Sequence, residues 1–183
     1  MSFYQKITEI GKKYNILNKL FKPVFNFSPM YSRSTAKLTK VSEDLHYIEV
    51  KIPISYKNRN YNGSIFGGSM FSAVDPVPMV QLVNLLDTSY VVWDKSAEIF
   101  FKKPAREDIY ADFDFSPEEI QEIKTKVKEL KEYTFVKQTQ LVSKDRRTVF
   151  CVINKTIYVA DKAFYKEKLR LRKEASDSHV IKS

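Results

Sequence analysis

Residues 63–76 read GSIFGGSMFSAVDP, and this stretch decides the fold of the 183-residue chain. Three of the four glycines in the chain lie within its first six residues, and the sequence up to Leu86 then contains no lysine, arginine or glutamate. Apolar residues recur there at helical spacing, and a helix that lacks charge on nearly every side is normally buried. The sequence therefore predicts a buried helix over residues 67–86.

Strands are predicted on both sides of this helix, because polar and apolar residues alternate there. The predicted strands span residues 35–41, 45–56, 89–104, 108–115, 133–143 and 148–160. Ser116-Pro117-Glu118-Glu119 supplies the serine, proline and glutamate of a capping box, which starts a charged surface helix over 117–130. Six strands around one apolar helix predict an α+β fold, with an antiparallel sheet wrapped around the central helix.

The segments outside the predicted sheet have a different character. Residues 1–22 place apolar side chains at steps of three and four, which predicts an amphipathic helix. That helix either docks on the domain or a partner subunit, or lies on an anionic membrane through its lysines. Pro23 and Pro29 then predict a linker, and residues 161–183 predict a charged tail that is helical at first and frayed at its end.

Composition limits the class of protein. The net charge of +9 attracts nucleic acid, anionic membranes or phosphorylated ligands, but the clustered arginines and stacking aromatics of a nucleic-acid site are missing, so no nucleic acid is expected. No stretch of about 20 apolar residues would span a bilayer, and no secretory signal is recognisable. The single cysteine, Cys151, reads as a small core residue and fits a reducing compartment, which predicts a cytoplasmic protein.

The stretch around the paired glycines resembles the signature of hotdog-fold acyl-CoA thioesterases of the phenylacetate-pathway type, in the order Asn60-x-x-Gly63-x-x-Phe66-Gly67-Gly68-x6-Asp75. In that signature an asparagine precedes a His-Gly-Gly, and an acid lies seven residues past the second glycine. Residues 90–106, YVVWDKSAEIFFKKPAR, are similar to the strand that follows the helix in the same superfamily. The pattern also resembles an uncharacterised branch of hotdog proteins, the DUF4442 type, and it covers residues 35–160.

The resemblance implies a thioesterase-like site in a homodimer or homotetramer. Backbone N–H groups at a helix N-terminus can stabilise an oxyanion, and the resemblance puts Gly67 and Gly68 in that role. Asp75 would be the general base or nucleophile, and Asn60 would hold the attacking water. Because Asp75 lies about two turns, or about 10 Å, from Gly68, the glycines of one subunit are expected to meet the acid of the other.

Two departures bear on this chemistry. Phe66 stands where the family has a histidine, and Pro76 directly follows the predicted acid. Asp-Pro also commonly starts a helix, so Asp75 could instead end one short helix (68–74) and cap the next (76–86). Both departures favour an alternative function, a non-catalytic hotdog module that binds an acyl chain or another apolar ligand.

Further polar residues have two interpretations each. Asp94 lies within a strand, where it could be a second site acid or could pair with Lys95, an arginine or a backbone amide. Around Pro104, three basic residues either grip the phosphates of coenzyme A or form a solvated turn: Lys102, Lys103 and Arg106. His46 and His179 belong to no metal pattern, so neither a metal nor a cofactor is expected beyond the coenzyme A part of the substrate.

Overall fold

A computed structural model describes residues 17–180 of the chain. Its elements in chain order are α2 (Leu17–Asn26), α3 (Pro29–Ser32), β1 (Lys37–Val41), β2 (Tyr47–Ile52), α4 (Gly67–Val74), α5 (Pro76–Leu85), β3 (Tyr90–Phe101), β4 (Ile109–Asp114), α6 (Pro117–Leu130), β5 (Glu132–Val142), β6 (Val149–Asp161) and α7 (Lys162–Val180). The strands form one antiparallel sheet in the order β1-β2-β4-β5-β6-β3. This confirms the predicted α+β class, the six strands and their hairpin at β1–β2.

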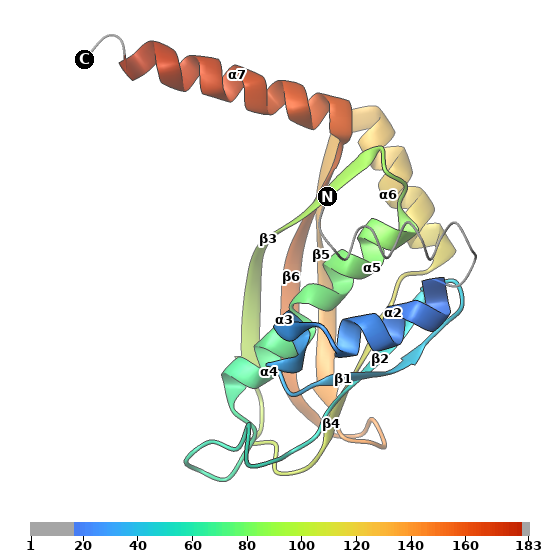
Figure 1. Ribbon diagram of the computed structural model, residues 1–183, viewed down its shortest axis with the longest axis vertical. Coiled ribbons are helices and arrows are strands. Elements are labelled where there is room, and N and C mark those ends of the chain that lie inside the picture. Colours follow the sequence, from blue (N-terminus) through green and yellow to red (C-terminus); the bar gives the residue numbers. More distant parts are fainter. Residues whose placement is uncertain (1–16, 181–183) are drawn as a thin grey trace.

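The helices α4 and α5 lie across one face of the sheet and form its core, as predicted for residues 67–86 (Figure 1). Met70, Ala73 and Val74 of α4 are buried against strands β2 and β4. The helix α6 starts with the predicted capping box at Ser116 and Glu119. It is less solvated than predicted, because one face buries Ile120, Ile123 and Val127 in a second cluster with the end of α5.

Most of the amphipathic helix predicted for residues 1–22 lies outside the described part of the chain. Residues 1–16 lie outside the described residues, and within the described part a helix covers Leu17–Asn26. The linker predicted at Pro23 is wrong: Pro23 lies inside α2, and Pro29 begins α3. The helix α2 is fixed by its burial, since Phe21 and Phe25 join the core and the Asn26 amide bonds the backbone of Leu38 in β1.

The tail is also more regular than its sequence predicts. The helix α7 runs from Lys162 to Val180 and projects from the body of the protein (Figure 1). Its first turns are anchored by Tyr165, whose ring lies against that of Tyr158, and by an ion pair between Lys168 and Glu132. Among the helices of the described residues, none combines the length and the apolar character that a membrane crossing requires.

The central helix continues through its two prolines with only a local disturbance. Asp75 has helical dihedral angles (φ −47°, ψ −52°), and its N–H still bonds the carbonyl of Phe71. Pro76 and Pro78 have no N–H to donate. Side chains reach carbonyls at this point: the Tyr31 hydroxyl donates to Ala73 at 3.1 Å, and the Lys155 ammonium donates to Asp75.

The strand β3 forms one edge of the sheet and pairs only with β6 among the described strands. Its pairing shifts between Asp94 and Ser96, so that Lys95 is an extra residue of a β-bulge. Large apolar side chains on this strand are exposed, namely Trp93, Phe100 and Phe101. An exposed edge with such side chains is a surface on which another strand can pair.

Replacing Arg146 with methionine should lower the free energy of unfolding by about 1–3 kcal/mol at pH 7. Arg146 joins the β5–β6 turn to the sheet through Asp112, at 2.9 Å, and Glu49, at 2.6 Å. Burial opposes ionisation of Asp112, but hydrogen bonds from Arg146 and Tyr47 outweigh it and hold the pKa of Asp112 below its usual value. Likewise, hydrogen bonds from Thr39, Lys40 and Arg146 outweigh burial and lower the pKa of Glu49.

Carboxylates with lowered pKa values stabilise the folded state above their usual pKa of about 4, and this stability is lost as the pH falls through the folded pKa. The difference between wild type and Arg146→Met should therefore shrink in urea unfolding below about pH 4. Arg147→Met is the control, because Arg147 is 87% exposed and 3.8 Å from Asp145. A variant difference that stays constant with pH would contradict this role for Arg146.

Candidate functional site

The first turn of α4 presents unused backbone donors. Phe66 occupies the N-cap position, and its side chain makes no capping hydrogen bond. Its carbonyl accepts from the N–H groups of Ser69 and Met70. In the described part of the chain, no hydrogen bond uses the N–H groups of Gly67 and Gly68. These two amides therefore point out of the helix N-terminus, where they can receive an anionic oxygen.

Two aromatic rings lie directly on these glycines. A Cβ atom on Gly67 would lie 2.6 Å from the Phe101 ring, and one on Gly68 would lie 2.3 Å from the Phe66 ring. Such distances require that both positions be glycine unless the rings move. Both rings are themselves 57% exposed. The donors are thus set in an apolar rim, and the Phe66 ring lies directly over Gly68.

A cavity of about 360 Å³ opens beside Gly67 and brings predicted residues together. Its lining includes Asn60, Gly67, Lys102 and Lys103, together with Phe101. Arg106 is exposed but does not line this cavity. The phosphate-binding role of the two lysines stays a prediction, and the structure adds that they share one cavity with Gly67.

Asn60 organises the loop that leads to the glycines. Its Oδ1 accepts from the N–H groups of Asn62 and Ser64, and its Nδ2 donates to the Ser64 hydroxyl at 3.0 Å. The Asn60 N–H also bonds the carbonyl of Ser64. The amide is therefore engaged in shaping this loop, and its predicted role as water holder stays a prediction.

Asp75 takes part in a partly exposed charge cluster around the buried Lys155 instead of capping a helix with its side chain. One helix ends before Asp75 and the next begins after it, as the capping alternative predicted, but the Asp75 side chain makes no capping hydrogen bond, so its predicted role as a cap is wrong. Its Oδ1 lies 2.9 Å from the Nζ of Lys155, and the same Nζ lies 2.6 Å from Oδ2 of Asp94. Asp94 is thus paired with Lys155, and not with Lys95, an arginine or a backbone amide as predicted. We call Asp75, Lys155 and Asp94 the acid–lysine cluster.

The sheet register explains why these three residues meet. Lys155 faces Ala97 across the β6–β3 ladder, and alternation along β6 places it on the inner face with Ile153 and Ile157. The bulge at Lys95 lets Asp94, opposite Ile157, also point inward. Lys155 was not among the predicted site residues, although its inward position in an alternating strand was a signal that could have identified it.

The predicted site residues therefore form two separate groups, one at the start of α4 and one at the junction of α4 and α5. Gly67, Asn60, Lys102 and Lys103 gather at the start of α4. The acid–lysine cluster lies at the junction of α4 and α5, against β6 and the edge strand β3. Asp75 does not line the Gly67 cavity.

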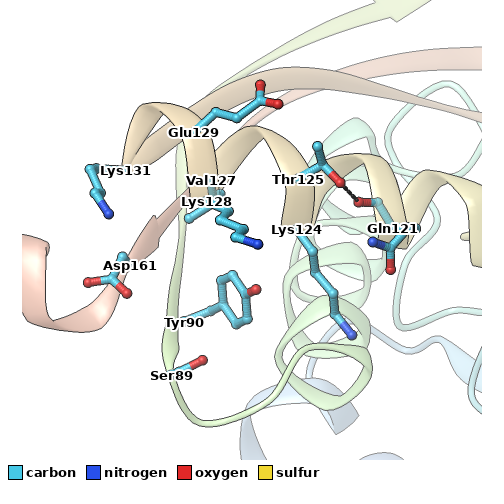
Figure 2. Close-up of a pocket in the computed structure, with 10 residues that line it drawn as sticks. All are labelled: Ser89, Tyr90, Gln121, Lys124, Thr125, Val127, Lys128, Glu129, Lys131 and Asp161. Atoms are coloured by element: carbon cyan, nitrogen blue, oxygen red, sulfur yellow. Dashed lines mark hydrogen bonds between the residues drawn. The ribbon is translucent and has the colours of Figure 1, made fainter.

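A larger cavity, of about 600 Å³, lies elsewhere, between α6 and the start of β3. Figure 2 shows Lys124 and Lys128 of α6 beside Tyr90 of β3, with Lys131 and Asp161 farther along. Burial and the nearby acids Asp87 and Asp161 raise the pKa of Tyr90. None of the predicted site residues lines this cavity.

The remaining predicted groups have simple surroundings. Cys151 is buried, and burial raises the pKa of its thiol to about 11. The Nδ1 of His46 contacts the carbonyl of Phe115. The described residues hold no group of three or more histidine, cysteine, aspartate or glutamate side chains that could bind a metal ion.

Comparison with known proteins assigns the family. Residues 18–159 match the model of the family described as Domain of unknown function (DUF4442), and the chain belongs to this family. The match begins within α2, so it includes the helices ahead of the first strand. A search of curated protein sequences found no match.

Solved structures with the same fold share little sequence with this chain. A Pseudomonas aeruginosa protein of unknown function, titled a probable thioesterase, superimposes with a TM-score of 0.70 at 18% identity, covering 78% of this chain and 95% of its own. A Haemophilus influenzae thioesterase gives 0.57 at 14% identity, with 78% and 90% covered. A Chlorobaculum tepidum protein of unknown function gives 0.64 at 13% identity, with 81% and 96% covered. The fold is therefore that of the hotdog thioesterases.

Proposed function

We propose that this DUF4442 protein binds acyl-CoA or a related acyl thioester and hydrolyses it. The observation that carries the proposal is the pair of unused N–H groups of Gly67 and Gly68 at the start of the central helix. Donors fixed in place, in surroundings that exclude water, stabilise the oxyanion that forms when a thioester carbonyl is attacked. The Phe66 and Phe101 rings lie on these donors but are themselves 57% exposed, so a bound acyl group would have to complete the exclusion of water.

The catalytic group in this proposal is Asp75, and it acts across a subunit boundary. Asp75 and Gly68 are seven residues apart on one helix, about 10 Å along its axis, so one carbonyl does not reach both in one chain. The exposed edge of β3 offers antiparallel pairing with a second copy. Asp75 bonds Lys155, which also bonds Asp94 of this strand, and these contacts support a role for Asp75 beside the proposed homodimer interface.

The reaction then follows from the charges. Asp75 either removes a proton from water as the water adds to the carbonyl carbon, or attacks that carbon itself. The carbonyl oxygen becomes negative against the two glycine amides, and one such donor contributes about 3 kcal/mol in the transition state. The carbon–sulfur bond then breaks and the thiolate leaves. When Asp75 has acted as base, it passes its proton to the thiolate, giving a free acid and a thiol. When Asp75 has attacked, the acyl group stays on it as an anhydride, and water hydrolyses this anhydride to the free acid and restores the carboxylate. Lys102 and Lys103, which share the Gly67 cavity, would bind the coenzyme A phosphates.

A second function, binding without turnover, is favoured by Phe66. Its ring lies over Gly68, so a substrate carbonyl reaches that amide only after the ring moves. The apolar part of the cavity, lined by Ile65, Met70 and Phe101, would also hold an acyl chain or another apolar ligand. This alternative keeps the homodimer and the cytoplasmic location that the proposal expects.

A panel of acyl-CoA thioesters of different chain lengths, followed by release of the free thiol, tests the proposal. Hydrolysis above the rate in buffer is expected for at least one substrate. The reagent that detects free thiols should not react quickly with the native protein, because its single cysteine is buried and the pKa of that thiol is raised to about 11. Absence of turnover with an acyl ligand retained through purification would favour the binding alternative.

Native mass spectrometry of the purified protein tests the assembly. The proposal expects a mass of two chains, or of four, and a shift in mass where an acyl species is bound. A variant with lysine at both Trp93 and Phe100, two exposed apolar residues of β3, should shift the protein toward single chains. A wild-type protein that is monomeric at micromolar concentration would contradict a site shared between subunits.

A further inference from the structure

We propose that Lys155 is the positioning residue of the site: it holds the Asp75 carboxylate in one orientation beside the edge strand β3, with Asp94 as the second anchor of the lysine. This inference rests on the proposed function, because it assigns the reactive carboxylate to Asp75. It adds a residue from β6, a strand that carries none of the predicted site residues. It also gives Asp94 a defined task.

The contacts of Lys155 use its whole charged group. Its side chain is 1% exposed, and its Nζ contacts Oδ1 of Asp75, Oδ2 of Asp94 and the backbone carbonyl of Asp75. An ammonium group has three N–H donors, and here each has one acceptor. Two of the three acceptors belong to Asp75, so the lysine fixes both the backbone and the side chain of this residue.

The same contacts hold one carboxylate oxygen of Asp75 and leave the other free to face a ligand. Oδ1 of Asp94 is buried and has no hydrogen-bond partner among the described residues. Oδ2 of Asp75 takes part in no hydrogen bond of the described chain, and the Asp75 side chain is 45% exposed. Asp75 therefore presents its second oxygen to the outside while its first is held. Such an arrangement suits a base or nucleophile that must face a ligand in one geometry.

Stability alone is a weak reason for a lysine in this position. A buried ion pair loses hydration, and replacement by apolar residues is often neutral or stabilising. The neighbours of Lys155 on the inner face of β6 are Ile153 and Ile157, so an apolar side chain would continue the core. Lys155 instead bridges the carboxylate of Asp75, at the junction of α4 and α5, and the carboxylate of Asp94, on the edge strand β3.

The double variant Lys155→Met/Asp94→Asn separates positioning from charge balance. It removes the cation and one carboxylate together, so the cluster keeps the wild-type excess of one negative charge on the partly exposed Asp75. The inference expects a folded protein whose kcat for the preferred thioester falls about 10- to 100-fold, as general base catalysis is weakened, while KM stays within about twofold because the Gly67 cavity is untouched. Lys40→Met/Asp114→Asn is the matched control: it removes one exposed cation and one exposed carboxylate outside the acid–lysine cluster, and its kcat should equal that of the wild type.

A double variant with wild-type kcat would overturn the inference and reduce Lys155 to charge balance. If that variant does not fold, Lys155→Leu/Asp94→Asn, which likewise removes the donors to Asp75 at constant charge, answers the same question. A crystal structure of the folded variant gives a readout besides activity: the Asp75 carboxylate should lose its single orientation. A carboxylate that keeps its place without Lys155 would also overturn the inference. Absence of turnover in the wild type would count against the proposed function alone, since the structural readout remains.

Discussion

Asparagine in place of Asp75 is expected to lower kcat for the preferred acyl thioester about 10³-fold, the size of a lost general base. The amide has the shape of the carboxylate, and its oxygen can still accept from Lys155, so the helix junction should stay folded. It cannot take a proton from water or attack a carbonyl as a carboxylate does. KM should change little, because Asp75 does not line the Gly67 cavity.

Steady-state kinetics on purified wild type, Asp75→Asn and Asp114→Asn provide the measurement. Asp114 is an exposed aspartate at the end of β4, so its substitution removes one negative charge without touching the acid–lysine cluster. Activity of Asp114→Asn should equal that of the wild type. Wild-type activity in Asp75→Asn would remove Asp75 from the chemistry and would limit the proposed site to the glycine amides and the lysines of the Gly67 cavity.

Methionine in place of Lys155, without a second change, is expected to lower the free energy of unfolding by about 3–5 kcal/mol. This substitution leaves the Asp94 and Asp75 carboxylates beside each other with no cation. It also leaves the carbonyl of Asp75 without its donor. The loss is costly because Oδ1 of Asp94 is buried without a partner, and the like charge of Asp75 stays beside that carboxylate with no cation between them. Domains of this size are stable by only about 5–15 kcal/mol, so the variant should approach the limit of folding.

Urea unfolding at pH 7 measures this effect, with Lys40→Met as the matched control. Lys40 pairs with Glu49 at 3.0 Å but is 67% exposed, and Glu49 keeps its bond to Arg146 when Lys40 is replaced. The control should lose less than about 1 kcal/mol, as exposed ion pairs do. If Lys155→Met lowered the free energy of unfolding no more than this control, the cluster would contribute little to folding. Adding Asp94→Asn to Lys155→Met should then not raise the free energy of unfolding again.

Much of the fold could be predicted because it is recorded in local patterns. The apolar helix from Gly67, the alternating strands and the capping box at Ser116 each depend on neighbours in sequence, and each is present. Proline was a poor guide at Pro23, where it predicted a linker. Pro23 lies within α2, where the aromatic pair Phe21 and Phe25 packs into the core, and burial outweighs the lost hydrogen bond.

The site was harder to predict, because its contacts join distant parts of the chain. The glycine pair was recognisable from its motif, but the meeting of Asp75 with Lys155 depends on the register of β6 against β3 and on the bulge at Lys95. The cap preference of an Asp-Pro pair is a local rule, and here a lysine 80 positions away determines the position of the side chain. A lysine at an inward position of a strand is the one local sign of this cluster.

The hydrogen bond from Tyr31 to the carbonyl of Ala73 ties the helices before the sheet to the helix that carries the glycine pair and the acid. Tyr31 is fully buried, and its ring packs edge-on against Phe25. The hotdog body of this protein therefore does not begin at its first strand. A chimera that exchanges sheets between family members should move α2 and α3 together with the central helix. A boundary drawn at β1 would remove Tyr31, whose hydroxyl bonds the carbonyl of Ala73 in α4.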